Sequence, residues 1–112
     1  MKLLLDKIIE VSEKLPQIKK REVKPGDWVF VKTMNSTYRI KADKNKEYII
    51  SGGWFEKNGL NNFRTNINGC TWGGSAIKTD VLAACGLSIE FGNRLKTSRI
   101  KKIIVLPACC AN

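Results

Sequence analysis

The first fifteen residues repeat apolar side chains at the spacing of an α-helix. Leu4, Ile8, Val11 and Leu15 fall on one stripe of the helical wheel. Pro16 disfavours a helical conformation for the residue before it, so the predicted helix spans residues 2–15. The helix has more apolar positions than one stripe needs. We expect this surplus to pack either against the same domain or against the same helix of a second copy, in a homodimer.

From Lys24 onward the pattern changes to short runs that alternate between apolar and polar positions and are separated by turn residues. The strands that this pattern predicts cover residues 28–33, 37–41, 48–51, 63–67, 70–72, 87–91 and 100–106. Asn68 and Gly69 form a dipeptide typical of a tight hairpin turn, which is predicted between two of these strands. Residues 80–85 fit either one helical turn or a buried strand.

Two strands allow finer predictions. The run at 28–33 is apolar on both faces, which predicts a strand that lies under the helix or at the centre of a closed sheet. The run at 87–91 ends at Gly92, and a two-residue loop there would place core and surface positions on one face. A three-residue loop or bulge instead pairs Phe91 with Leu95 and Glu90 with Lys96, and this register is the prediction.

Six or seven short strands without helical crossovers predict a mostly β fold in a single domain over residues 1–112. The expected architecture is a small antiparallel β-barrel or sandwich, of the size of SH3-like or OB-like domains, with one N-terminal amphipathic α-helix; a barrel is favoured. The predicted segments are a helix (2–15), a basic connector and turn (16–26), a barrel (27–107) and a frayed tail (108–112). Residues 25–29 (PGDWV) resemble the opening of SH3-like barrels, but the glycine pattern of the KOW motif is missing, so no family follows.

Charge gives the first indication of a partner. Twenty Lys and Arg against ten Asp and Glu give a formal net charge of +10, which attracts anions. We therefore expect nucleic acid, single-stranded rather than duplex, or an acidic protein as the partner; the alternative is that the lysines serve only solubility. No apolar stretch is long enough to predict a membrane span. Four cysteines without a secretory signal predict free thiols and a cytoplasmic protein.

The sequence offers little for catalysis. There is no His, and the cysteines lack the spacing of a zinc site, so neither a metal nor a cofactor is expected. Cys85 stands in an apolar run and is predicted to be buried, whereas Cys70 follows a predicted turn and is less certain. The carboxylates, among them Asp27, are predicted to be solvated. An enzyme that uses Cys70 with a nearby Lys stays a third hypothesis.

Two segments place a Trp beside a pair of glycines, and their tryptophans are Trp54 and Trp72. Glycine permits close backbone approach and Trp offers a large flat surface, which together suit a ligand platform. The alternative is that the glycines make bends and both Trp side chains fill the core. The predicted function is a non-catalytic, basic binding module, and the alternative is a protein-interaction or homo-oligomeric module that uses the helix. The predicted ligand-binding residues are Trp54, Trp72, Arg39, Lys41, Arg64, Arg94, Lys96 and Lys101.

Overall fold

The computed structural model describes residues 17–72 and 76–108, and within these ranges the fold is mostly β, as predicted. The strands are β1 (Gln17–Lys19), β2 (Trp28–Thr33), β3 (Thr37–Ala42), β4 (Tyr48–Gly52), β5 (Phe63–Thr65), β6 (Ile67–Trp72), β7 (Ala76–Lys78), β8 (Val81–Ala84), β9 (Ser88–Phe91) and β10 (Ile100–Leu106). The short helices are η1 (Lys20–Glu22), η2 (Lys44–Lys46) and α2 (Gly53–Lys57). The predicted helix at 2–15 lies outside the described residues, as does the dimer that it would form.

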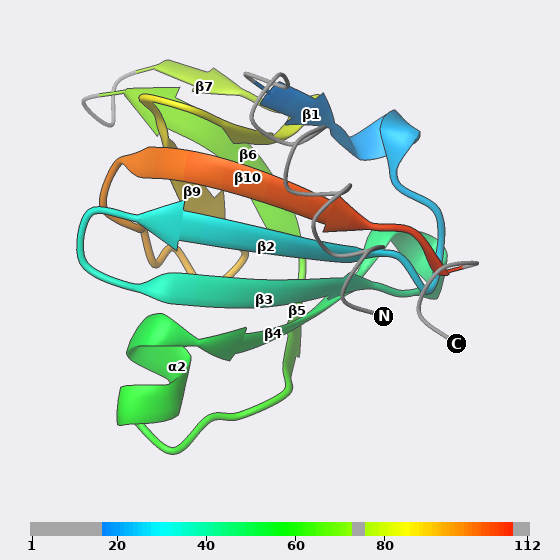
Figure 1. The fold of residues 1–112 in the computed structure, drawn as a ribbon, viewed down its shortest axis with the longest axis horizontal. Coiled ribbons are helices and arrows are strands. Elements are labelled where there is room, and N and C mark those ends of the chain that lie inside the picture. Colours follow the sequence, from blue (N-terminus) through cyan, green and yellow to red (C-terminus); the bar gives the residue numbers. More distant parts are fainter. Residues whose placement is uncertain (1–16, 73–75, 109–112) are drawn as a thin grey trace, which may run out of the picture.

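The described strands form three antiparallel sheets. The largest has the order β10-β2-β3-β4-β5, a second has the order β7-β6-β9, and β1 pairs with β8. Figure 1 shows β10, β2 and β3 side by side in front of β6 and β9. The barrel favoured from the sequence is wrong for this part of the chain, because none of these sheets closes on itself. Strands alternate between inward-facing apolar and outward-facing polar residues in a sandwich and in a barrel alike. This pattern therefore could not distinguish the two architectures.

The core lies between the large sheet and the two smaller ones. Val29, Val31, Ile40 and Ile50 are fully buried on the inner face of the large sheet. An aromatic cluster fills one end of this space, where the Phe55 ring contacts those of Tyr38, Phe63 and Phe91 at centroid distances of 5.1 to 6.2 Å. Burial of these side chains from water supplies the main driving force for packing the sheets together.

Residues 80–85, which were ambiguous in the sequence, contain the strand β8. All four of its side chains are buried, and Ala83 pairs with Ile18 of β1. Two small Ala side chains let neighbouring strands approach closely from both faces. A short strand that is apolar on both faces has no periodicity to distinguish it from a buried helical turn, which explains the ambiguity.

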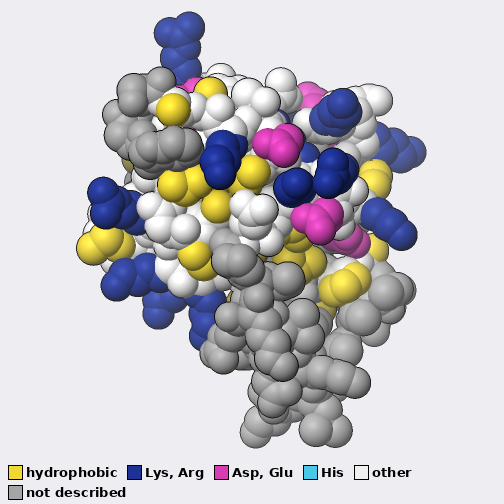
Figure 2. All heavy atoms as spheres, turned by 90° about the horizontal axis from the view of Figure 1, so that it is seen from above, with side chains coloured by type: hydrophobic (Ala, Val, Ile, Leu, Met, Phe, Trp, Pro, Cys, Tyr) yellow, Lys and Arg dark blue, Asp and Glu magenta, His cyan; other side chains and the backbone are white. Residues whose placement is uncertain are grey.

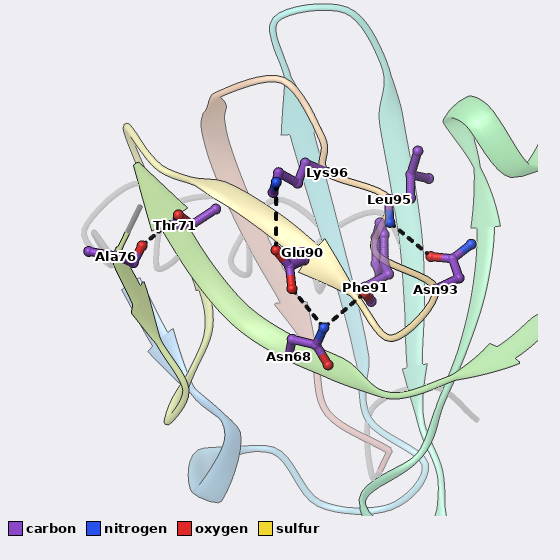
Figure 3. A network of polar contacts seen from close by, with 8 residues as sticks. All are labelled: Asn68, Thr71, Ala76, Glu90, Phe91, Asn93, Leu95 and Lys96. Carbon is purple, nitrogen blue, oxygen red and sulfur yellow. Dashed lines mark hydrogen bonds and ion pairs between the residues drawn. The ribbon is translucent and has the colours of Figure 1, made fainter. Parts of the chain in front are cut away.

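The hairpin turn predicted at Asn68 and Gly69 is wrong. Residues 67–72 form one continuous strand, with a bulge opposite β9 between Ile67 and Gly69. Gly69 has φ +148°, and a Cβ there would collide with the carbonyl of Lys78. The Asn68 side chain donates to Glu90 at 2.7 Å and to the Phe91 carbonyl at 3.2 Å (Figure 3). Glycine is therefore needed here because another backbone approaches closely at a bulge, and not because the chain makes a tight turn.

The register predicted at the end of β9 is confirmed. The Phe91 N–H donates to the Leu95 carbonyl at 2.9 Å, and Glu90 pairs with Lys96. Arg94 has a positive φ of 69°, and its N–H donates to the Phe91 carbonyl at 2.8 Å. This is a three-residue loop that ends in a left-handed residue, one of the common hairpin connections. The ion pair between Lys96 and Glu90 is drawn in Figure 3.

Asp27 corrects two expectations, because it is buried and holds the start of the predicted tail. Only 8% of its surface is exposed. One carboxylate oxygen accepts the Lys24 N–H at 2.9 Å and closes the turn before β2, and the other accepts the Ala108 N–H at 2.8 Å. Asp27 is therefore not a solvated side chain, and Ala108 is not frayed. Residues 109–112 lie outside the described ranges.

Candidate functional site

The large sheet has one face turned away from the core, and here we call it the outer face. Strand register places its side chains in rows across the strands: Trp28 lies opposite Lys41 and Leu106, and Phe30 lies opposite Arg39 and Ile104. The Trp28 row continues through Ile49 of β4 to Arg64 of β5, and the Phe30 row continues to Ser51 of β4. A third row pairs Lys32 with Lys102 of β10. The outer face therefore combines apolar and aromatic side chains with five basic ones: Lys32, Arg39, Lys41, Arg64 and Lys102.

Two aromatic rings of β2 lie next to each other on the outer face. Trp28 and Phe30 are half-buried, and their rings are nearly parallel, with centroids 6.0 Å apart and an interplanar angle of 15°. The Lys41 ammonium lies 5.7 Å from the centre of the Trp28 ring, in the geometry of a cation–π contact. Residues two apart in a strand point to the same side, which brings these rings together. The result is an aromatic platform with a cation beside it.

The basic side chains of the outer face differ in how they are held. Arg39 donates from Nε to the Ser51 hydroxyl at 3.1 Å, which orients its guanidinium across the sheet. Arg64 forms an ion pair with Asp43, and this contact lowers the pKa of the Asp43 carboxyl and raises that of the guanidinium. Because both groups of the pair are exposed, solvent and salt screen it. Arg39 is exposed and Lys41 is half-buried beside the Trp28 ring.

The structure separates the basic residues that the sequence analysis grouped. Arg39, Lys41 and Arg64 share the outer face. Arg94 and Lys96 lie in and after the loop that follows β9, on the smaller sheet of the opposite layer. Lys101 lies on the edge strand β10, at an irregularity in its register with β2. Five predicted cations (Arg39, Lys41, Arg94, Lys96 and Lys101) therefore do not form one surface.

The glycine pair before Trp54 has a packing role. A Cβ on Gly52 would collide with the Thr37 carbonyl, and one on Gly53 would collide with the Tyr38 ring, so glycine lets α2 approach β3. Trp54 itself is 38% exposed, and its ring lies edge-on against Phe55 at 5.4 Å. It lies on α2 and outside the outer face. Trp72 is the last residue of β6, and its side chain lies outside the described residues.

Sequence reasoning missed Trp28 and Phe30 as binding candidates. Their position on one face of a strand was readable from the alternation. The same alternation also fits a strand covered on both sides, which was the interpretation given to it. The register with β3 adds the observation that the alternation lacks, because it sets Lys41 and Arg39 opposite these rings. The prediction that the helix at 2–15 covers this strand lies outside the described residues. Cross-strand register depends on tertiary pairing, which the alternation within one strand does not show.

No family model, curated protein or solved structure significantly matches this chain. The geometry therefore carries the functional argument. Within residues 17–72 and 76–108, no group of three His, Cys, Asp or Glu side chains is placed to hold a metal ion. In the same part of the chain, no helix has the length and apolarity that crossing a membrane requires.

The two described cysteines have opposite environments. Cys70 is fully buried, its thiol lies 3.5 Å from the Leu82 carbonyl, and burial raises its pKa to about 11. Cys85 is exposed, which corrects the prediction that it is buried. The reason is the turn that follows β8: it turns Cys85 outward although its sequence neighbours Ala84 and Gly86 are small and compatible with a core.

We expect Cys85 to react with a disulfide reagent at pH 8 far faster than Cys70. With a pKa of about 11, only about one Cys70 thiol in a thousand is ionised at this pH, and the thiolate is the reactive form. The measurement is stopped-flow labelling in a background that carries Cys109→Ser and Cys110→Ser, with and without denaturant. One fast thiol in the folded protein and two in the unfolded protein is the expected result. Fast labelling of Cys70 in the folded state would instead favour a cysteine enzyme.

Proposed function

We propose that this chain is a non-catalytic binding module for single-stranded nucleic acid and that the strand lies on the outer face. The observation that carries the proposal is the pair of nearly parallel rings, Trp28 and Phe30, with the Lys41 ammonium beside them. Unpaired bases stack on aromatic side chains, while neighbouring Lys and Arg side chains bind the phosphates. Duplex bases are already stacked on each other, which favours the single strand.

The charges of the chain support this choice of ligand. The net charge is +10, and the described strands add Lys32 and Arg39 to the cation beside the rings. Arg39 is oriented by its bond to Ser51, so less freedom is lost when it binds a phosphate. An acidic protein would use the same charges, but its Asp and Glu side chains have no rings to stack on the platform. The platform therefore favours the single strand as the partner.

Catalysis has little support. Cys70 is buried with a raised pKa, so the cysteine that the enzyme hypothesis uses is held in its unreactive form. The homo-oligomeric alternative depends on residues 2–15, outside the described ranges, and stays a prediction. Light scattering of the full chain tests it directly.

The experiment that tests the proposal is a fluorescence anisotropy titration of a labelled 20-nucleotide strand without internal pairing, with a duplex of equal length and polyglutamate as competitors. We expect tighter binding of the single strand than of the duplex, weak competition by polyglutamate, and an affinity that falls steeply with salt because bound counterions are released. Absence of binding at 50 mM salt would remove the proposal. Equal competition by polyglutamate would favour an acidic protein.

A further inference from the structure

A second feature lies at one end of the sheets and is formed by residues that are not part of the outer face. It is a pocket of about 540 Å³, lined by three segments that are distant in sequence: residues 19–25, 42–48 and 79–80. This volume falls in the range of pockets that hold small molecules. Its wall is formed by η1, by the turn between β3 and β4 that contains η2, and by the turn between β7 and β8.

The pocket has an apolar part and a strongly cationic part. The apolar part comes from Val23, Pro25 and Ala42, beside the ring of Tyr48. The cations are Lys19, Lys20, Arg21 and Lys46, against the carboxylates of Asp43 and Asp80. Figure 2 shows Lys and Arg side chains close to Asp and Glu side chains on the face above β1 and η1, with apolar side chains between them. Asp43 is already paired with Arg64, which leaves the cations in excess.

Two of these cations repel each other across the pocket. The pKa of Lys20 is lowered by burial and then by the charge of Lys46, and Cys70 and Asp80 offset only part of this. Lys46 is held by the turn, where Asn45 and Lys46 both have positive φ, 62° and 60°. Two adjacent residues without glycine in this conformation cost free energy. The half-buried Lys20 ammonium, placed in this way near the exposed Lys46, is stabilised by a bound anion.

We propose that this pocket binds a phosphomonoester. Its phosphate would lie between the ammonium groups of Lys20 and Lys46, and its apolar or aromatic body against Val23, Pro25 and Tyr48. A dianionic phosphate offers three acceptor oxygens and pairs with both ammonium groups at once. The combination of cationic and apolar walls fits a nucleotide better than it fits inorganic phosphate.

The nucleotide has two sources. One is a free nucleoside monophosphate, and the other is the 5′-phosphorylated end of a strand, a source that rests on the proposed function. Lys41 connects the two regions, because it belongs to the outer face and its charge contributes to lowering the pKa of Asp43 on the pocket wall. The outer face and the pocket therefore adjoin at this end of β3.

The test uses adenosine 5′-monophosphate as the probe and follows ¹⁵N-labelled full-length protein by NMR. We expect shifts concentrated in residues 19–25 and 42–48, with at least about tenfold weaker binding of adenosine and of inorganic phosphate. Lys20→Gln and Lys46→Gln should each weaken binding of adenosine 5′-monophosphate by about tenfold. Lys57→Gln, a matched change on α2, should leave the affinity for adenosine 5′-monophosphate unchanged. Urea unfolding of each variant checks that it is folded.

A second arm compares strands with a 5′-phosphate and a 5′-hydroxyl. Tighter binding of the phosphorylated strand, lost in Lys46→Gln, supports the strand end as the source. Equal binding of both strands, with the mononucleotide still in the pocket, supports the free nucleotide. No shift in residues 42–48, or an affinity of Lys20→Gln and Lys46→Gln for the mononucleotide equal to that of the unmodified protein, overturns the proposal. Binding of the 5′-hydroxyl strand to the outer face is measured independently, so the proposed function can hold or fail without this site.

Discussion

Replacing Phe55 with alanine is expected to lower the free energy of unfolding by about 3–5 kcal/mol. Phe55 is fully buried, and its ring contacts those of Tyr38, Phe63 and Phe91. It is the side chain through which α2 reaches the space between the sheets. Removing the ring leaves a cavity that the surrounding β-strands, fixed by their hydrogen bonds, fill only in part. Small domains have a total stability of about 5–15 kcal/mol, so the loss is a large fraction.

Urea unfolding, followed by circular dichroism and by fluorescence, measures this effect. The matched control is Trp54→Ala, the neighbouring position on α2, where the side chain is 38% exposed and a loss of about 1 kcal/mol or less is expected. Similar losses at the two positions would contradict the assignment of the core contacts of α2 to Phe55, with Trp54 at the surface.

Replacing Trp28 and Phe30 together with alanine is expected to weaken binding of single-stranded nucleic acid by about 1–3 kcal/mol for each base that stacks on them. For two bases this is a loss of at least about thirtyfold in affinity. The physical reason is the loss of the parallel rings, with the cations of the outer face left in place. The salt dependence of binding should therefore change little while the affinity falls.

Folding must be separated from binding in this variant, because both rings are half-buried. Circular dichroism and urea unfolding report whether the sheet is intact, and Phe30→Leu offers a milder second variant. Trp54→Ala serves again as the control, since it removes an exposed aromatic ring that lies off the outer face. If Trp54→Ala weakens binding and the folded Trp28 and Phe30 variants do not, the platform is on α2 instead.

Part of the strand pattern was predictable because β2, β3 and β9 alternate between buried and less buried positions. The runs at 28–33 and 100–106 match β2 and β10 to within a residue, and the loop after β9 followed from asking which residues could share a face. These features depend on local sequence and on the alternation of side chains between the two faces of a strand. They needed no knowledge of how the sheets pack.

The rest depends on contacts between distant segments. A glycine in a strand and a glycine in a turn have the same local signal, so Gly69 was assigned to a hairpin although it is set by close approach to Lys78. The exposure of Cys85 follows from the turn after β8, and the burial of Asp27 follows from its bond to Ala108, 81 residues away. The binding platform was missed for the same reason.

The most direct test of the outer face compares two triple variants that each remove three positive charges. One carries Lys32→Gln, Arg39→Gln and Lys41→Gln on the outer face. The other carries Arg94→Gln, Lys96→Gln and Lys101→Gln, at positions off that face. The measurement is the affinity for the labelled single strand as a function of salt. We predict that the first variant loses most of the affinity and that its salt slope becomes shallower by about 2, the value for three phosphate contacts on a single strand. The second variant should stay close to the unmodified protein. Equal losses in the two variants, or a larger loss in the second, would contradict this prediction.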